Sequence, residues 1–79
     1  MKTDRRFVVE RWECTQGLTV SVYRKGSHIR TGTVDMAAPT GECVWIASDP
    51  YEGRTLIHRS EGYILTVDEQ QSAFLNGLT

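Results

Sequence analysis

Aromatic and basic side chains gather in one short stretch of the chain, between two runs that alternate apolar and polar residues. The stretch holds Tyr23, Arg24, Lys25, His28 and Arg30. Arginine and lysine can neutralise phosphates, and an exposed tyrosine ring can stack on an unpaired base. This group predicts a nucleic-acid-binding surface, which a later strand can extend with Arg54, His58 and Arg59. The alternative is a solvated hairpin tip whose charges prevent aggregation through strand edges.

An acidic turn with a tyrosine forms a second candidate surface. Asp49, Tyr51 and Glu52 lie in the sequence DPYEG, where proline and glycine favour a β-turn. Such a turn leaves Tyr51 exposed, whereas Trp12, Trp45 and Tyr63 are expected in the core. Together with Glu61, the turn can meet a basic or peptide partner. The second function we expect is therefore a protein-interaction module or a small inhibitor.

Cysteines and histidines are present, but their spacing favours neither a metal site nor catalysis. Zinc sites usually contain C-x-x-C or H-x-x-x-H pairs, and Cys14, Cys43, His28 and His58 form neither. Both cysteines lie in apolar runs typical of strands, where free buried thiols are favoured over a disulfide. A chain of 79 residues also leaves little room for a substrate pocket. We therefore expect no metal, no cofactor and no enzyme activity.

Length and composition predict one small domain over residues 1–79, with a single modest core. No run of about 20 apolar residues occurs, and no apolar block follows the N-terminus, so we expect a cytoplasmic protein without a membrane partner. The net charge of −1 neither requires nor excludes nucleic acid, although residues 1–30 are mostly basic and residues 31–79 mostly acidic. A homodimer formed through an uncovered strand edge is compatible with either function.

A β-hairpin over residues 18–36 is the central element of the predicted fold. Leu18, Val20 and Val22 alternate with polar residues, which is typical of a strand with one buried face. A polar turn separates this strand from a second one. Because apolar residues change parity between the start and the end of the second strand, we expect a bulge or sharp bend at Gly32.

Shorter elements flank this hairpin. Residues 7–14 are predicted to form a strand, although Val8 and Trp12 can equally form a helical pair. Residues 42–48, 54–59 and 63–67 are predicted to form further strands.

The C-terminal segment predicts a helical turn over residues 69–76. Asp68 can cap it by accepting from the N–H of Gln71, whose side chain can reach back in a capping box. Gly77 suits a left-handed stop. Phe74 and Leu78, four residues apart, are expected to pack together onto the core.

The order of the predicted strands and turns carries a family resemblance. The elements are Val20/Val22, Arg30-Thr31-Gly32-Thr33-Val34, Gly41, Val44/Trp45/Ile46, Gly53, Leu56/Ile57, Ser60-Glu61-Gly62 and Leu65/Val67. Over residues 18–67 this order resembles SH3-like small barrels, among them Sm-like proteins and small bacterial SH3-like domains. The resemblance implies a mainly β fold: a five- to six-stranded antiparallel SH3-like barrel with a short C-terminal helix. No Asn follows Asp35 as in the Sm-like pattern, so the resemblance implies no site residue.

Overall fold

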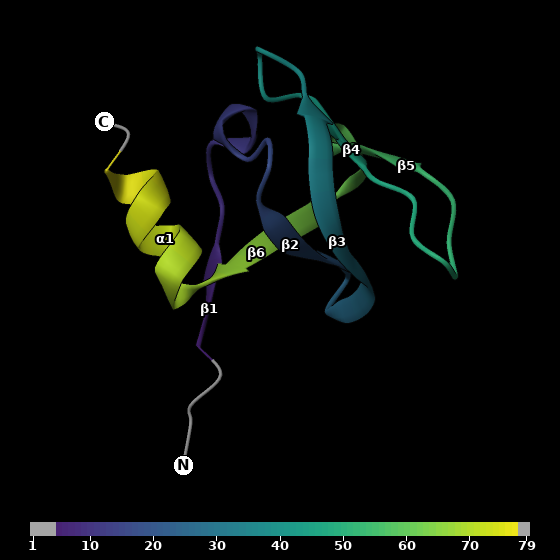
Figure 1. Cartoon of the computed structure of the whole chain (residues 1–79), viewed down its shortest axis with the longest axis horizontal. Helices are drawn as coiled ribbons and strands as arrows, with labels where there is room; N and C mark the ends of the chain where they lie inside the picture. The colour runs from purple at the N-terminus through teal and green to yellow at the C-terminus, as the bar shows by residue number, and fades with distance from the viewer. Residues whose placement is uncertain (1–4, 78–79) are drawn as a thin grey trace.

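The computed structural model describes residues 5–77. Its elements are β1 (Arg6–Val8), the 3₁₀ helix η1 (Trp12–Cys14), β2 (Thr19–Arg24), β3 (Ser27–Ala37), β4 (Cys43–Ile46), β5 (Thr55–His58), the 3₁₀ helix η2 (Arg59–Glu61), β6 (Tyr63–Asp68) and α1 (Glu69–Asn76). The prediction of a mainly β, antiparallel fold with a short C-terminal helix is confirmed (Figure 1).

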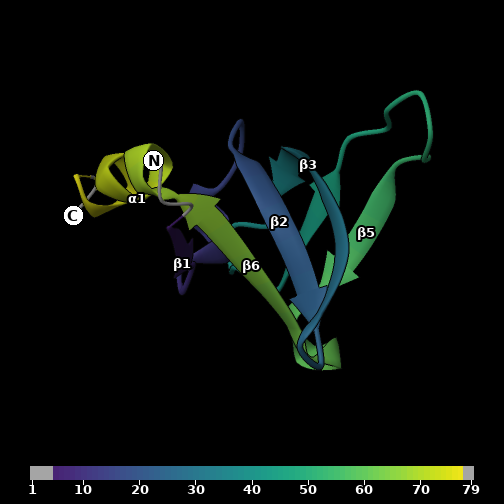
Figure 2. The ribbon, with the colours of Figure 1, turned by 90° about the horizontal axis from the view of Figure 1, so that it is seen from below.

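The six strands form one sheet in the order β1-β6-β2-β3-β4-β5, and every neighbouring pair is antiparallel. Strand β3 is long enough to pair with two partners in succession: residues 27–33 pair with β2, and residues 34–37 pair with β4. Figure 2 shows β1, β6 and β2 on one side and β5 on the other, with β3 between them. The sheet therefore folds over itself, and its concave side encloses the core.

The core consists of alternate residues of the strands together with one tryptophan from η1. Its buried apolar side chains are Val9, Trp12, Val20, Val22, Val34, Val44, Ile46, Ile57, Leu65 and Val67. Burying a valine or leucine fully contributes about 1.5–3 kcal/mol relative to leaving it exposed. Trp12 lies in this core as expected, whereas Trp45 and Tyr63 are only partly buried. The expectation of three core aromatics is therefore wrong for Trp45, whose strand parity places it on the opposite side of β4 from Val44 and Ile46.

The predicted strand over residues 7–14 is wrong beyond Val8. The Val9 N–H donates to the Leu65 carbonyl at 2.8 Å, and the chain then leaves the sheet. A single 3₁₀ turn follows, closed by the Thr15 hydroxyl, which donates to the Trp12 carbonyl at 2.6 Å. This turn directs the Trp12 ring into the core, while Val8 remains 64% exposed. Burial of one large aromatic side chain thus outweighs the local preference for a strand.

The predicted bulge at Gly32 is wrong in its position, because Gly32 pairs regularly with Val20. The register instead shifts where Val22 pairs with Arg30 and Tyr23 pairs with His28, so Ile29 is the extra residue. A second shift in β3 falls between Val34 and Met36, opposite β4.

These two shifts decide which side chains of β3 face the core. Ile29 is 48% exposed and Met36 is 54% exposed, whereas Arg30 is buried. Gly32 has a different role: a Cβ atom there would lie 2.6 Å from Ile46 Cγ2. The glycine therefore permits a close approach between β3 and a core residue of β4.

Helix α1 has the predicted bounds, and Asp68 caps it by accepting from the Gln71 N–H at 2.8 Å. The Gln71 side chain does not return to Asp68. Its amide oxygen accepts from the Thr19 N–H at 2.7 Å, and its amide nitrogen donates to the Thr19 carbonyl at 2.7 Å. This pair of hydrogen bonds joins α1 to the start of β2.

The end of α1 differs from the prediction. Gly77 has φ −76°, so the left-handed stop is wrong. Phe74 is 56% exposed, and it is Leu75 that packs against the core. Leu78, the expected partner of Phe74, lies outside the described residues. Within residues 5–77, no helix has the length and apolar character needed to cross a membrane.

Candidate functional site

The hairpin between β2 and β3 closes with a tight turn at Lys25 and Gly26. Both residues have positive φ, +52° and +79°, as in the two-residue turns that match the twist of paired strands. Lys25 is the only residue other than glycine with positive φ in the part of the chain that the structure describes. The turn places the lysine side chain in solvent at the tip of the hairpin.

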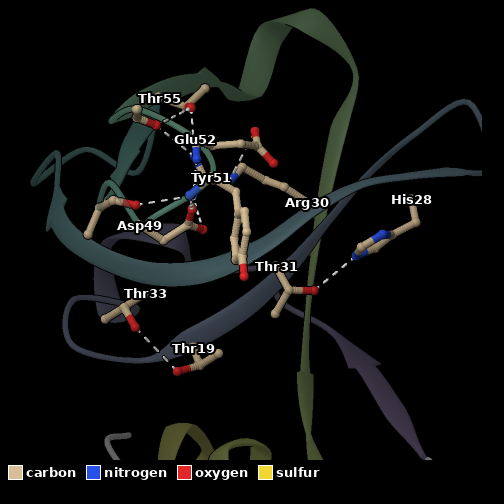
Figure 3. Close-up of polar contacts among 11 residues, drawn as sticks. Thr19, His28, Arg30, Thr31, Thr33, Asp49, Tyr51, Glu52 and Thr55 are labelled. Atoms are coloured by element: carbon tan, nitrogen blue, oxygen red, sulfur yellow. Dashed lines mark hydrogen bonds and ion pairs between the residues drawn. The ribbon is translucent and has the colours of Figure 1, made fainter.

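Tyr23 and His28 face each other across this hairpin. Their ring centroids lie 5.3 Å apart and the rings are inclined at 67°, which is an edge-to-face arrangement. His28 Nε2 also lies 2.9 Å from Thr31 Oγ1 (Figure 3). Because His28 is exposed and Tyr23 is partly exposed, the two rings form a small aromatic surface beside the tip.

Arg24 lies at the same hairpin tip but on the other side of β2, where it pairs with Tyr63 of β6, and it is held in place by β6 and η2. Its guanidinium carbon lies 5.1 Å from the centre of the Tyr63 ring, and its Nε donates to the Glu61 carbonyl at 3.1 Å. Both partners are uncharged groups, a ring and a main-chain oxygen. The positive charge of this exposed arginine therefore remains available to an anion.

Hydroxyl groups lie on the same side of the sheet as the Tyr23 and His28 rings. We call this side the outer face because it points away from the core. The Ser21 and Thr31 hydroxyls lie 2.9 Å apart. Those of Thr19 and Thr33 lie 3.4 Å apart (Figure 3). Each pair joins β2 to β3. The outer face of the hairpin thus offers neutral donors and acceptors beside the aromatic rings.

Arg6 is a member of this surface that sequence reasoning missed. Its Nη2 donates to the Thr66 carbonyl at 2.9 Å, and its Nε donates to the Thr66 hydroxyl at 3.3 Å. Thr66 in turn pairs with Ser21 of β2. Only the pairing of β1 with β6 brings Arg6 to this face, and the sequence pattern contains no signal for that pairing.

The outer face carries both signs of charge, but its hairpin end is basic. No Asp or Glu occurs in β2 or in residues 27–34 of β3. Lys25 lies at the tip, and Arg6 lies at the β1 end opposite Asp68, whose side chain caps α1. Three of the five predicted nucleic-acid-binding residues, Tyr23, Lys25 and His28, are therefore brought together, and Arg24 lies at the same tip on the other side of β2.

Arg30, the fifth predicted residue, lies inside the protein. It is 3% exposed and points to the concave side of the sheet. Its Nη1 donates to the Gly53 carbonyl at 2.9 Å and to the Thr55 hydroxyl at 2.8 Å. Its Nη2 donates to the Ala47 carbonyl and to Asp49 Oδ2, both at 3.1 Å (Figure 3). The prediction that Arg30 contacts phosphate is wrong, because all of these donors are directed into the protein.

The loop over residues 47–53 is organised around this buried arginine. Asp49 Oδ1 accepts from the N–H groups of Tyr51 and Glu52 at 2.8 Å each. These two hydrogen bonds, and then the nearby Arg30 guanidinium, lower the pKa of Asp49 below its ordinary value. Glu52 Oε2 lies 3.9 Å from Arg30 Nε. Two of the three predicted protein-binding residues therefore face Arg30, while Tyr51 projects outward and is 93% exposed.

The later basic residues make contacts of their own on other parts of the sheet. Arg54 donates to both carboxylate oxygens of Asp35 at 2.8–2.9 Å and lies 4.3 Å from the centre of the Trp45 ring. Its hydrogen bond lowers the pKa of Asp35. Arg59 lies 5.4 Å from the centre of the Trp12 ring and donates to the Glu10 carbonyl. No contact joins these residues to Tyr23 or Lys25 in the described part of the chain.

The cysteines and histidines are spread over both halves of the sheet. Cys14 and Cys43 are free thiols, each partly buried. His58 pairs with Cys43 across β4 and β5, whereas His28 lies on the hairpin. Within residues 5–77, no three His, Cys, Asp or Glu side chains are arranged to hold a metal ion.

Comparison of the chain with protein-family models, with curated proteins and with solved structures finds no match. The resemblance to SH3-like barrels stays a prediction.

Proposed function

We propose that this chain is a non-catalytic binding domain that binds single-stranded nucleic acid across its outer face. The observation that carries the proposal is the pairing of the Tyr23 and His28 rings at a hairpin tip whose exposed charged side chains, Arg24 and Lys25, are both cations. Stacking rings and backbone-neutralising cations are the two elements of single-strand binding that does not depend on sequence.

Each outer-face residue has a chemical role in this proposal. The Tyr23 and His28 rings stack on an unpaired base, and Lys25 neutralises a phosphate beside it, while Arg24 contacts another phosphate from the other side of the hairpin tip. Arg6 contacts a further phosphate at the β1 end of the face. The hydroxyls of Thr31 and Thr33 are then within reach of base edges or of the ribose 2′-OH.

The affinity for nucleic acid is expected to fall with rising salt concentration, and the size of the fall depends on how many phosphates the cations contact. With about three phosphates contacted, raising the salt from about 50 to about 200 mM should weaken binding about 18-fold, because the logarithmic slope is about −0.7 per phosphate. Fluorescence anisotropy of a labelled mixed-sequence strand of about 12 nucleotides measures this. Absence of binding at the lower salt concentration would remove the proposal.

Two variants separate the roles within the site. Tyr23→Ala should weaken binding about tenfold by removing a stacking platform. Lys25→Asn should reduce the salt dependence, since asparagine tolerates positive φ but carries no charge. Arg11→Gln is the matched control, because exposed Arg11 pairs with Glu13 away from this face. An equal loss in the control would show that net charge, rather than the outer face, decides binding.

A second candidate function is protein binding through the loop over residues 47–53. It is favoured by the 93% exposure of Tyr51 on a loop fixed by buried Arg30, since rigid exposed tyrosines are common anchors at interfaces. We expect Tyr51→Ala to leave thermal stability unchanged and to abolish recovery of a specific partner from a native lysate. Phe74→Ala removes another exposed aromatic as a control. Identical partners with wild-type protein and Tyr51→Ala would count against this loop.

A further inference from the structure

His28 is the ionisable side chain within residues 18–36 whose type changes charge near neutral pH, since histidine takes up a proton between about pH 8 and about pH 5. Two contacts on the outer face hold its ring. The Tyr23 ring lies edge-to-face at 5.3 Å, and Thr31 Oγ1 lies 2.9 Å from Nε2 (Figure 3). Within residues 5–77, the other ring nitrogen, Nδ1, makes no hydrogen bond. Because His28 is exposed, Nδ1 is open to a ligand.

The protonation state of His28 decides what Nδ1 offers to a ligand. In a neutral imidazole one nitrogen donates and the other accepts. When Nε2 donates to Thr31, Nδ1 carries a lone pair that repels an anion, and in the other tautomer Nδ1–H donates without a positive charge. In the imidazolium both nitrogens donate, so Nε2 keeps its bond to Thr31 while Nδ1–H is available to a phosphate oxygen. Thr31 then accepts from His28 and can donate to Ser21 Oγ, 2.9 Å away, so the hydroxyl pair fits the protonated ring.

The groups around His28 contain no carboxylate that would neutralise its proton. On β2 and the turn, its neighbours are Tyr23 and Lys25, while Arg24 lies on the other side of the strand. On β6, the partner beyond Tyr23 is Ile64, which carries no ionisable group. Strand β4 pairs only with the far end of β3, so it adds no facing side chain. In the part of the chain that the structure describes, no hydrogen bond or ion pair joins His28 to an acid. A protonated His28 therefore adds a free cation to the hairpin end of the outer face.

We propose that His28 is a pH-dependent phosphate contact, so that the outer face binds single-stranded nucleic acid more tightly when this ring is protonated. The inference rests on the nucleic-acid function proposed above and adds its regulation by pH. An imidazole can stack on a base through its face and donate to a phosphate through its edge, so the two roles of His28 are compatible. Only the protonated ring combines a positive charge with a donor at Nδ1. The affinity therefore rises as the pH falls from about 8 to about 5.5.

The test measures binding of the full chain to a labelled oligothymidine of about 12 nucleotides, whose bases do not protonate between about pH 8 and about pH 5.5. In about 50 mM salt we expect about tenfold tighter binding at the lower pH, because a charge-assisted hydrogen bond to phosphate forms. The logarithmic salt slope should steepen from about −2.1 to about −2.8, because one more phosphate is contacted. His28→Gln should show neither change, since glutamine can donate to Thr31 but carries no charge.

His58→Gln is the matched control, because His58 is an exposed histidine on β5, in the other half of the sheet. This variant should keep the whole pH effect. NMR of the ring protons distinguishes the two histidines: since the coupling is reciprocal, bound oligothymidine should keep His28 protonated to a higher pH and leave the titration of His58 unchanged. Equal affinity at both pH values, or a pH effect that persists in His28→Gln, would overturn this inference and leave the nucleic-acid function standing. Absence of binding at both pH values would overturn the two together.

Discussion

Replacing Arg30 with alanine is expected to remove about 3 kcal/mol of folding stability. The substitution takes away the four hydrogen bonds that Arg30 donates to two carbonyls, a hydroxyl and a carboxylate. The Gly53 carbonyl keeps the Thr55 hydroxyl as a donor, and Asp49 keeps two main-chain N–H donors. Removing one member of a buried ion pair costs about 3–5 kcal/mol, and the lower end applies here because the Asp49 side chain is 39% exposed. A domain of 79 residues has about 4–12 kcal/mol in total, so this loss is a large part of it. Urea denaturation followed by circular dichroism measures the change.

Two milder substitutions show which property of Arg30 matters. Arg30→Lys keeps the charge but offers one compact ammonium, which cannot reach the carbonyls of Ala47 and Gly53 and the Asp49 carboxylate together. Arg30→Met keeps the apolar volume and removes every donor. We expect Arg30→Lys to be intermediate in stability between wild type and Arg30→Ala. A loss below about 1 kcal/mol in Arg30→Ala would mean that the loop network contributes little to folding.

Arg30→Lys also tests whether Arg30 takes part in nucleic-acid binding or only supports the loop over residues 47–53. Because Arg30 faces the concave side, Arg30→Lys should leave oligonucleotide binding unchanged under conditions where it is folded. The loop over residues 47–53, in contrast, should become more mobile in Arg30→Lys. Arg30 therefore acts as a structural residue that fixes the position of Tyr51, and not as a member of the phosphate-binding group.

The error over Arg30 has a physical origin in the hairpin. The alternation of side chains along a strand places Ile29 inward and Arg30 outward only if the ladder is regular. One extra residue at Ile29 reverses that parity, and the bulge depends on how β2 and β3 pair. Hydrogen-bond acceptors for Arg30 come from a loop about twenty residues further on, which no local pattern reveals.

Local sequence patterns predict an element correctly where the contacts that determine it are made between residues close together in the chain. The bounds of α1 follow from the Asp68 cap and were predicted correctly, as was the turn that contains Asp49. The contribution of Arg6 to the outer face and the position of Trp45 depend on strand order instead. Residues 43–46 are apolar on both parities, so only the fold decides that Val44 is inside and Trp45 outside.

Gly32→Ala is expected to destabilise the fold by about 2 kcal/mol, since adding atoms to a closely packed site usually costs about 1–3 kcal/mol. The added Cβ would lie 2.6 Å from Ile46 Cγ2 and 3.4 Å from Arg30 Nη2. Ile46 is fully buried, and its branched side chain has little rotational freedom with which to move away. Gly32 does not have positive φ, so alanine meets no conformational barrier and the cost is steric.

A control and a rescue distinguish this steric cost from a general effect of alanine in this region. Gly53→Ala adds a Cβ that meets no atom within 4 Å, also without positive φ, and should be neutral or slightly stabilising. Ile46→Ala removes the Cγ2 atom and on its own costs about 2–5 kcal/mol. In that background Gly32→Ala should cost much less than in the wild type, because the colliding atom is gone. Urea denaturation of all four members of this double-mutant cycle measures the coupling, and an unchanged cost in the Ile46→Ala background would show that the approach of β3 to β4 is not the reason for the glycine.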